Sequence, residues 1–416
     1  MIHANTGRIQ QHLEKLAEFT ATPGEGTTRM SYSPQGQQAR AYIKEQMQAV
    51  GLTITEDAIG NIFGKSAALE PELPSVMIGS HFDSVPNGGA FDGPAGVVMG
   101  LEVAALFHEH RLLPRYPLEV VALVEEEGSS FGRGLLASSA IVGKVSADEL
   151  HRLRDDQGRS AAECMAQVGF NADDVANVVR TPESIKAFIE LHIEQGPVLE
   201  QTGTDVGLVD VIVSITQLTV TFTGKAGHAG TTPMGSRHDA LVAASQVITR
   251  VGDFARKAGE ETVATVGKLQ VFPNGANVIP SKVVFTVDIR SKSLDKLQQV
   301  VEQTKACIQL QAGEGITFSV EQPLMVEPTR LDEGIHEQLT KHSKSLGLSY
   351  RTMVSGAGHD AMMFAGITRV GLVFVPSKDG LSHHPDEWTD YAQIQKGVDV
   401  VFYTVKEITE AKAHDQ

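Results

Sequence analysis

The chain has 416 residues, of which 41% are hydrophobic and 21% charged, and its 51 acidic and 35 basic residues give a net charge of −16. A single hydrophobic core rarely serves so long a chain, so we expect two domains. The acidity excludes the basic surface of a nucleic-acid-binding protein and disfavours binding to anionic membranes.

Signals for export, membrane insertion and disulfide bonding are not found in the sequence. The first residues, MIHANTGRIQQHLEKL, are polar and lack the apolar core of a signal peptide. No stretch approaches the ~18 apolar residues that span a bilayer. Cys164 and Cys307 are too few and too far apart for a disulfide framework or a thiolate zinc site. We therefore expect a cytoplasmic protein.

The first half of the chain alternates between helix-like and strand-like patterns. Apolar residues at helical spacing predict helices at 7–19, 35–50 and 95–108. Continuous apolar runs predict strands at 76–78, 120–124 and 187–191. Because these strands are continuously apolar rather than alternating, they indicate a sheet covered on both faces, and hence an α/β fold.

The middle of the chain has a different pattern. Residues 218–223 alternate strictly between apolar and polar side chains, which predicts a strand with one solvent-exposed face. The predicted elements that follow are a helix at 239–257, strands at 263–271 and 283–290, a helix at 294–312 and a strand at 316–320. The order βαββαβ is that of a ferredoxin-like module, which we place at 211–325.

The α/β pattern returns after this module. The predicted elements are a helix at 334–346, strands at 351–354 and 370–375, and a final helix from about 390. His192 precedes the module and the pair His383-His384 follows it, so a single metal site would unite both flanks. We therefore expect residues 1–210 and 326–416 to form one catalytic domain, with 211–325 inserted into it.

His81 and Asp92 are the first candidate metal ligands. His81, in GSHFDSV, follows a short apolar strand, where a histidine often has only a structural role. Asp83 shares a face with His81 in an extended chain and could accept the second ring N–H, as is typical beside metal-binding histidines. Asp92, in GGAFDGPAG, lies where a helix begins, so it could cap that helix, bridge two cations, or do both.

Three acidic residues, Glu125, Glu126 and Glu127, end the predicted strand EVVALV. An isolated acidic run is usually a solvated loop, but this strand delivers the run to the sheet edge where ligands bind in α/β folds. Adjacent side chains on an extended chain point to opposite sides. One glutamate could therefore bind metal while its neighbour acts as general base on a water, as metal-assisted hydrolysis requires.

His192, after a buried strand in ELHIEQG, and His383-His384, before a proline, complete the set. Each is weak evidence alone, but together with the residues above they indicate a hydrolytic site with two metals. Imidazole and carboxylate ligands without thiolate suit Zn²⁺, Mn²⁺, Co²⁺ or Ni²⁺, and the ligand types do not choose among these.

Eight motifs distributed along the chain carry a family resemblance. They are GSHFDSV, NGGAFDGPAG, EEEGS, ELHIEQGPVLE, GHAGTTPM, ANVIP, SGAGHDA and LSHHPDEW. In this order they resemble the motifs of the N-carbamoyl-L-amino-acid hydrolases and allantoate amidohydrolases, in the dimetal aminoacylase and carboxypeptidase superfamily. The resemblance runs from about Gly26 to the C-terminal helix. It implies a dimetal catalytic domain with an inserted ferredoxin-like lid and dimerisation domain.

The resemblance also implies a ligand set. His81, Asp92 and His192 would hold one divalent metal, and Asp92 would bridge to a second metal held by Glu127 and His383. The family pattern S-H-x-P selects the first histidine of the pair and leaves the other at a variable position.

Further roles follow from the same resemblance. Glu126 would be the general base. The spacing of Asp83 from His81, rather than the resemblance, leads us to expect that Asp83 supports His81 in the catalytic set. His228, in GHAGTTPM, would stabilise the transition state when the lid closes, although a loop histidine can also have no role. The lid modules of this family pair, which implies a homodimer.

Substrate would be bound by Asn277 and Arg290 of the lid, and by Gly358 and His359. A guanidinium suits a substrate carboxylate, although Arg290 could equally form a surface ion pair at its strand end. The implied reaction hydrolyses the ureido group of an N-carbamoyl-L-amino acid to the L-amino acid, CO₂ and NH₃.

Two departures and several alternatives stay open. Ser130 stands where the family usually carries an arginine, and Ile215 where some relatives carry a glutamine. Allantoate and N-carbamoyl-β-alanine are alternative substrates, and aminoacylase or dipeptidase activity is a weaker alternative. A catalytically silent binding protein on this scaffold is disfavoured by the intact ligand set and Glu126. The sequence has no phosphate-binding G-x-x-x-x-G-K-S/T loop, which disfavours nucleotide chemistry.

Overall fold

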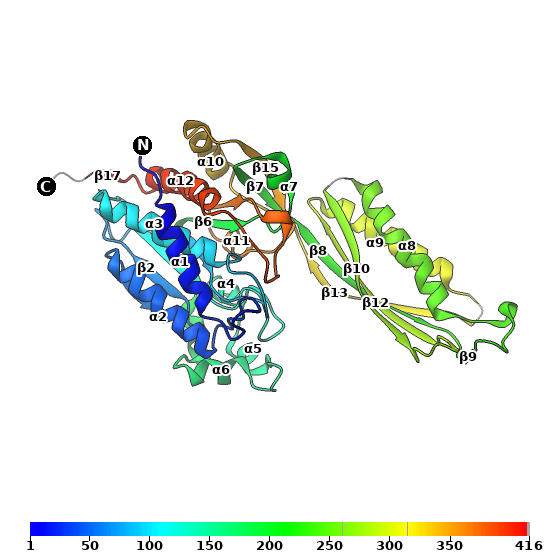
Figure 1. The fold of residues 1–416 in the computed structure, drawn as a ribbon. Coiled ribbons are helices and arrows are strands. Elements are labelled where there is room, and N and C mark those ends of the chain that lie inside the picture. Colours follow the sequence, from blue (N-terminus) through cyan, green and yellow to red (C-terminus); the bar gives the residue numbers. More distant parts are fainter. Residues whose placement is uncertain (260, 314, 414–416) are drawn as a thin grey trace. The chain divides into compact units, whose positions relative to one another are not determined.

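The computed structural model describes residues 1–259, 261–313 and 315–413, and the chain divides into two units (Figure 1). Unit 1 comprises Met1–Asp210, Arg330–Met353 and Ala357–Gln416. Unit 2 comprises Val211–Thr329 and Val354–Gly356. Each unit is described separately below.

Unit 1 is built on a sheet that has nine strands within the described residues, in the order β1-β2-β5-β3-β6-β16-β7-β14, with β15 paired to β7. The central strands β5, β3, β6 and β16 are parallel, whereas β2 and β7 join them antiparallel. The strand bounds are β1 Thr53–Glu56, β2 Ile62–Lys65, β3 Ser75–His81, β5 Leu118–Leu123, β6 Ile185–Ile193, β7 Val206–Ile212, β14 Thr329–Arg330, β15 Tyr350–Ser355 and β16 Val370–Val375.

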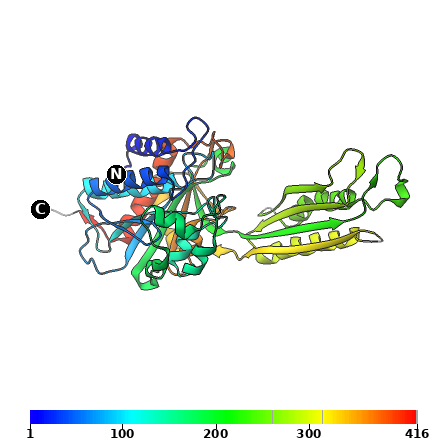
Figure 2. The ribbon, with the colours of Figure 1, turned by 90° about the horizontal axis from the view of Figure 1, so that it is seen from below.

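The central strands are buried almost throughout, because helices cover them; among their residues only Lys186 of β6 is partly exposed. All residues of β3, β5 and β16 are buried, as expected for parallel strands with both faces covered. Helices α1, α3 and α12 pack against one another, and α3 and α12 also pack against the central strands (Figure 2). The helix bounds are α1 Thr6–Glu18, α2 Pro34–Ala49, α3 Pro94–Glu109, α4 Leu136–Ile141, α5 Ala147–Arg152, α6 Ala161–Gln167, α7 Val198–Thr202, α10 Glu333–Ser345, α11 Asp360–Phe364 and α12 Tyr391–Ile408. A short pair, β4 Leu112–Leu113 and β17 Lys412–Ala413, lies outside the main sheet.

Unit 2 is an antiparallel sheet of order β10-β12-β8-β13, with α8 and α9 packed side by side against it (Figure 1). Alternate residues of β12, among them Phe285 and Val287, enter the core beneath these helices, while their neighbours are partly exposed. The bounds are β8 Ser214–Thr223, α8 Ala240–Ala258, β10 Thr262–Phe272, β12 Lys282–Ser291, α9 Leu294–Gln311 and β13 Thr317–Val326. A second small pair, β9 Gly227–His228 and β11 Val278–Ile279, extends from this unit.

The predicted fold class, α/β with an inserted βαββαβ module, is confirmed by this order of elements. The sequence patterns did not predict the short helices α4, α5 and α6, because helices of six or seven residues are too short to show a helical period. Within the described part of the chain, no helix is long and apolar enough to cross a bilayer.

Candidate metal centre

Three neighbouring parallel strands bring the candidate ligands to one edge of the unit 1 sheet. His81 is the last residue of β3, and its partner in β5 is Leu123, two residues before Glu125. His192 lies near the end of β6, on the other side of β3. Because the carboxyl ends of parallel strands share an edge, residues far apart in sequence meet there.

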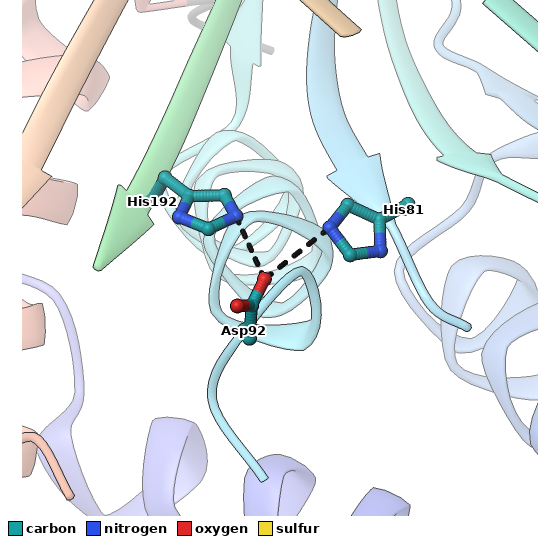
Figure 3. A group of neighbouring side chains, drawn as sticks. All are labelled: His81, Asp92 and His192. Carbon is teal, nitrogen blue, oxygen red and sulfur yellow. Dashed lines mark ion pairs between the residues drawn. The ribbon is translucent and has the colours of Figure 1, made fainter. Parts of the chain in front are cut away.

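The first group of candidate ligands is His81, Asp92 and His192, which are all buried (Figure 3). Both imidazoles face the same oxygen of the aspartate: the distance to Asp92 Oδ1 is 3.1 Å from His192 Nε2 and 3.5 Å from His81 Nε2. Two ligands that bind one cation at ~2.1 Å in tetrahedral geometry lie about 3.4 Å apart. The spacing of this group therefore fits a divalent metal.

The second group is Asp92, Glu127 and His383. His383 Nε2 lies 3.2 Å from Asp92 Oδ2 and 3.4 Å from Glu127 Oε2. Asp92 thus presents one oxygen to each group, which is the arrangement of a carboxylate that bridges two cations. Glu127 Oε1 is buried and has no hydrogen-bond partner within the described residues, so a cation there would satisfy it.

Asp92 does not cap helix α3, so that alternative is wrong. The residue before the helix is Gly93, at φ 81°, and no side chain caps the end of the helix. A Cβ atom at Gly93 would lie 2.4 Å from Cε1 of His81. The glycine therefore permits both the turn and the close approach of the imidazole, and it leaves the Asp92 carboxylate free for the metal centre.

Asp83 supports the glutamates more directly than it supports His81. Its two carboxylate oxygens accept the backbone N–H groups of Glu126 and Glu127, at 3.2 and 3.3 Å. Nδ1 of His81 lies 3.2 Å from the backbone carbonyl oxygen of Asp83 and 3.5 Å from its Oδ1. The buried carboxylate of Asp83 therefore fixes the segment that carries both candidate glutamates.

The prediction that adjacent glutamates point to opposite sides is wrong. Strand β5 ends at Leu123, and Glu125 has a left-handed backbone at φ 54°, so the chain is no longer extended where the glutamates lie. Glu126 and Glu127 both offer a carboxylate oxygen to the same group as His81. Glu125 points elsewhere, is only 1% exposed and accepts a hydrogen bond of 2.8 Å from Ser130 Oγ, so it is not part of a solvated loop.

The electrostatics of the centre favour bound cations. Burial raises the pKa of Glu126 well above its ordinary value, and it raises that of Glu127 to about 7 with a contribution from the charge of Asp92. Burial acts in the same direction on Asp92, but His192, His383 and His81 hold its pKa well below the usual range. The hydrogen bond to Asp92 raises the pKa of His383 to about 9. Divalent cations would offset this excess of buried negative charge.

His359 also lies at the centre. Its ring contacts that of His192 edge-on, with centroids 4.6 Å apart, and it is 1% exposed. Burial holds its pKa well below the ordinary value, so the imidazole is neutral. Gly358 immediately precedes it, ahead of helix α11. His384, by contrast, is exposed, and its Nδ1 accepts the backbone N–H of Asp386.

The candidate substrate residues of unit 2 lie in two places. His228 pairs with Val278 across the β9–β11 pair, and the backbone N–H of Ala229 donates to the carbonyl of Asn277. His228 is exposed, and its Nδ1 accepts the N–H of Gly230 at 3.0 Å, so a neutral ring carries its proton on Nε2. The structure thus brings His228 and Asn277 together.

Arg290 lies at the opposite end of the unit 2 sheet. Lys282 at one end of β12 pairs with Thr223 of β8, and Arg290 near the other end pairs with Ile215. The eight residues that separate Lys282 from Arg290 extend over about 27 Å. Arg290 forms the ion pair that its position suggested, with Nε 2.8 Å from Asp288 Oδ1, and Nη1 also donates to the carbonyl of Gly356 at 2.7 Å.

Three residues at the metal centre were not found from the sequence. Gln195 Nε2 donates to Asp92 Oδ2 at 2.6 Å, and the hydroxyl of Ser382 lies 2.9 Å from the same oxygen. Glu387 accepts hydrogen bonds from the backbone of the Asp92 segment. All three lie within motifs of the family resemblance, but a single polar residue has no periodic pattern that would mark its contacts.

Comparisons with known proteins show similarity along nearly the whole chain. Residues 77–407 match peptidase family M20/M25/M40. The chain is 40% identical to an N-carbamoyl-L-amino-acid amidohydrolase of Paenarthrobacter aurescens, over 97% of this chain and 98% of that protein. It is 36% identical to the allantoate amidohydrolase of Escherichia coli strain K12, over 94% of this chain and 95% of that protein.

Solved structures give the same result. A hydantoinase/carbamoylase family amidase from Burkholderia multivorans superimposes with a TM-score of 0.92 at 34% identity, covering 98% of each chain. The family resemblance predicted from the motifs is confirmed, together with the dimetal-hydrolase fold. The chain belongs to peptidase family M20/M25/M40 and is a hydrolase.

Proposed function

We propose that the chain is a metal-dependent amidohydrolase that cleaves the ureido C–N bond of N-carbamoyl-L-amino acids, giving the L-amino acid, CO₂ and NH₃. The observation that carries the proposal is the position of Glu126. Its Oε2 lies 3.8 Å from Nε2 of His81, beside a ligand set built for two cations, while Asp83 fixes its backbone. Relatives of 37–40% identity bear the name N-carbamoyl-L-amino-acid amidohydrolase.

The ligands would be the two groups that share Asp92: His81 and His192 on one side, Glu127 and His383 on the other. Two divalent cations held there would polarise the ureido carbonyl and lower the pKa of water toward neutrality. Zn²⁺, Mn²⁺, Co²⁺ and Ni²⁺ all suit this donor set.

Glu126 would move the proton. Because burial raises its pKa, the carboxylate is a stronger base than a solvated glutamate, so it would take a proton from the attacking water and then pass it on. Water adds to the carbamoyl carbon, the C–N bond to the amino acid breaks, and Glu126 passes the proton to the leaving nitrogen. The carbamic acid so formed decomposes to CO₂ and NH₃.

We propose that unit 1 is the catalytic domain, that unit 2 is the lid, and that the protein acts as a homodimer. His228 would donate Nε2–H to the developing oxyanion, Asn277 would assist, and Arg290 would hold the substrate carboxylate. A carbamoyl amino acid is comparable to two residues of extended chain, ~7 Å, far less than the ~27 Å between the two ends of the unit 2 sheet. One copy of unit 2 therefore does not supply all three residues to one substrate, whereas two copies can.

This dimer has a direct test. His228→Ala and Arg290→Ala should each abolish activity, and mixing the two variants under subunit exchange should restore part of it, because a hybrid dimer regains one complete site. A protein that is monomeric by sedimentation while fully active would disprove the dimer.

Allantoate is the second candidate substrate, because allantoate amidohydrolases are 35–36% identical over 94% of this chain. Ammonia release from a panel of N-carbamoyl-L-amino acids, N-carbamoyl-β-alanine and allantoate would decide between them. We expect the highest kcat/KM for an N-carbamoyl-L-amino acid, and a higher value for allantoate would overturn the proposed substrate. Glu126→Gln should lower kcat by about 10²–10⁴-fold without loss of metal. A Glu126→Gln variant with the kcat of the wild type would show that Glu126 is not the general base.

A further inference from the structure

Glu387 is a buried carboxylate next to the metal centre that is not among the candidate ligands. It is 4% exposed and lies four residues after His383, in the loop before helix α12. Every ligand group found in the described residues omits it. A buried charge needs hydrogen bonds to be stable, so the partners of Glu387 indicate its purpose.

One oxygen of Glu387 holds the loop that carries Asp92. Oε1 accepts the backbone N–H groups of Phe91 and Asp92, both at 3.0 Å. These residues are 296 and 295 positions away in the chain. The carboxylate thus joins two loops, each of which supplies a candidate ligand of the same metal.

The other oxygen reaches the same aspartate through a hydroxyl. Ser382 Oγ lies 3.0 Å from Glu387 Oε2 and 2.9 Å from Asp92 Oδ2. Since a hydroxyl has one proton, Ser382 shares it between the two carboxylates. Glu387 therefore binds the backbone of Asp92 directly and the side chain of Asp92 through Ser382.

Gly89, in the loop that carries Asp92, leaves room for the Glu387 carboxylate. A Cβ atom there would lie 2.0 Å from Glu387 Oε1 and 2.1 Å from its Cδ. Any larger residue at Gly89 would displace the carboxylate from the N–H groups that it accepts.

We propose that Glu387 is a positioning residue that fixes Asp92 relative to His383 and so sets the affinity of the metal site that these two share. This inference rests on the proposed metal centre. Residues that hydrogen-bond to metal ligands typically change metal affinity by 10–100-fold when they are removed. The Glu387 clamp, defined as Glu387 with Ser382, Phe91 and Asp92, is such an arrangement, with the backbone N–H groups as additional anchors.

The experiment is a calorimetric titration of metal-free protein with Mn²⁺, for the wild type, Glu387→Ala and Glu387→Gln. An amide at this position keeps a carbonyl oxygen for the two N–H groups and an NH₂ group that can donate to Ser382. We therefore expect Glu387→Ala to weaken one of the two Mn²⁺ sites by 10–100-fold and Glu387→Gln to restore it to within threefold. Gly89→Ala, which keeps the glutamate but displaces it, should resemble Glu387→Ala.

Glu102 provides a matched control. It is also a fully buried glutamate, and its carboxylate accepts the N–H of Asn5 at 2.7 Å and hydrogen bonds from Arg8; no candidate ligand group among the described residues includes any of these three residues. Glu102→Ala should lower the melting temperature without changing Mn²⁺ affinity. If Glu387→Ala does not fold, Ser382→Ala, which removes only one connection of the clamp, should still weaken the site measurably.

The outcomes separate the two proposals. A wild-type protein that binds no Mn²⁺ would overturn the metal centre itself. If the wild type binds two ions, Glu387→Ala with unchanged affinity, or Glu387→Gln as weak as Glu387→Ala, would overturn the clamp while leaving the centre intact.

Discussion

Asp83→Asn tests how the site is held together. The carboxylate of Asp83 accepts the N–H groups of both Glu126 and Glu127. An asparagine has a single carbonyl oxygen, so one of these N–H groups would face an NH₂ group. Loss of a hydrogen bond to a charged group costs about 1.5–3 kcal/mol.

A second effect opposes this loss in the metal-free protein. Burial raises the pKa of Glu125, Glu126 and Glu127, and the negative charge of Asp83 adds to the shift of each, so Asp83 repels all three carboxylates. Like charges ~4 Å apart repel by about 4 kcal/mol at an effective dielectric constant of 20, and by less when they are further apart. Because relief of this repulsion opposes the lost hydrogen bond, the unfolding free energy of the metal-free variant should fall by less than the lost hydrogen bond alone would cost, about 1.5–3 kcal/mol.

For bound metal the two effects act together. The variant loses both a negative charge near the cations and the anchor of the glutamate segment, so Mn²⁺ affinity should fall by about 10–100-fold. Urea denaturation of the metal-free proteins and calorimetric Mn²⁺ titration measure the two quantities separately. Unchanged Mn²⁺ affinity, with or without a loss of stability, would refute this account of Asp83.

Asp57→Asn is the matched control for that experiment. Asp57 also accepts backbone N–H groups, from Ile59, Gly60 and Asn61, but through a single oxygen that an asparagine retains. Only the bond from Asn61 Nδ2 to the other oxygen would be lost. Stability should therefore fall by about 1 kcal/mol, with Mn²⁺ affinity unchanged.

Three further predictions concern pH, backbone and metal. Burial lowers the pKa of His12 to about 4, so its contribution to stability is complete above pH 6.5, the unfolded value, and is lost as the pH falls toward 4. The unfolding free energy of the wild type should be about 2 kcal/mol lower at pH 5 than at pH 7, and His12→Gln should lack this difference. The same pH dependence in both proteins would contradict the role of His12. Gly93→Ala, at φ 81° and 2.4 Å from His81 Cε1, should weaken Mn²⁺ binding and lower stability by at least ~1 kcal/mol, measured as for Asp83→Asn. Chelation of metal held at 100 times its Kd should lower unfolding free energy by about 2.7 kcal/mol, and a melting temperature independent of metal concentration would argue against binding.

Much of the fold could be predicted from the sequence because its strongest patterns are also its most buried elements. The apolar runs at 76–78, 120–124 and 187–191 became strands β3, β5 and β6, and the strict alternation at 218–223 became part of β8. Burial on both faces leaves a continuous apolar run, and burial on one face leaves an alternating one. The segment of α4–α6 has neither pattern, since each helix is under two full turns.

The metal centre could be predicted only where a side chain follows a patterned strand. His81 and His192 terminate buried runs, so the sheet itself brings them together. The positions of Glu126 and Glu127 were less predictable, because they depend on the left-handed backbone of Glu125, which no periodic pattern reveals.

Glu387 shows where prediction from a single sequence ends. Its partners are backbone N–H groups 295 and 296 residues away, and every non-proline residue has such a group. The chemistry of a carboxylate therefore does not identify which N–H groups it accepts. Only the three-dimensional path of the chain identifies them. The Asp92 loop approaches Glu387 so closely at Gly89 that a side chain there is excluded. Residues that bind a metal can be recognised by their type, whereas residues that hold those ligands in place are recognised by the backbone that they contact.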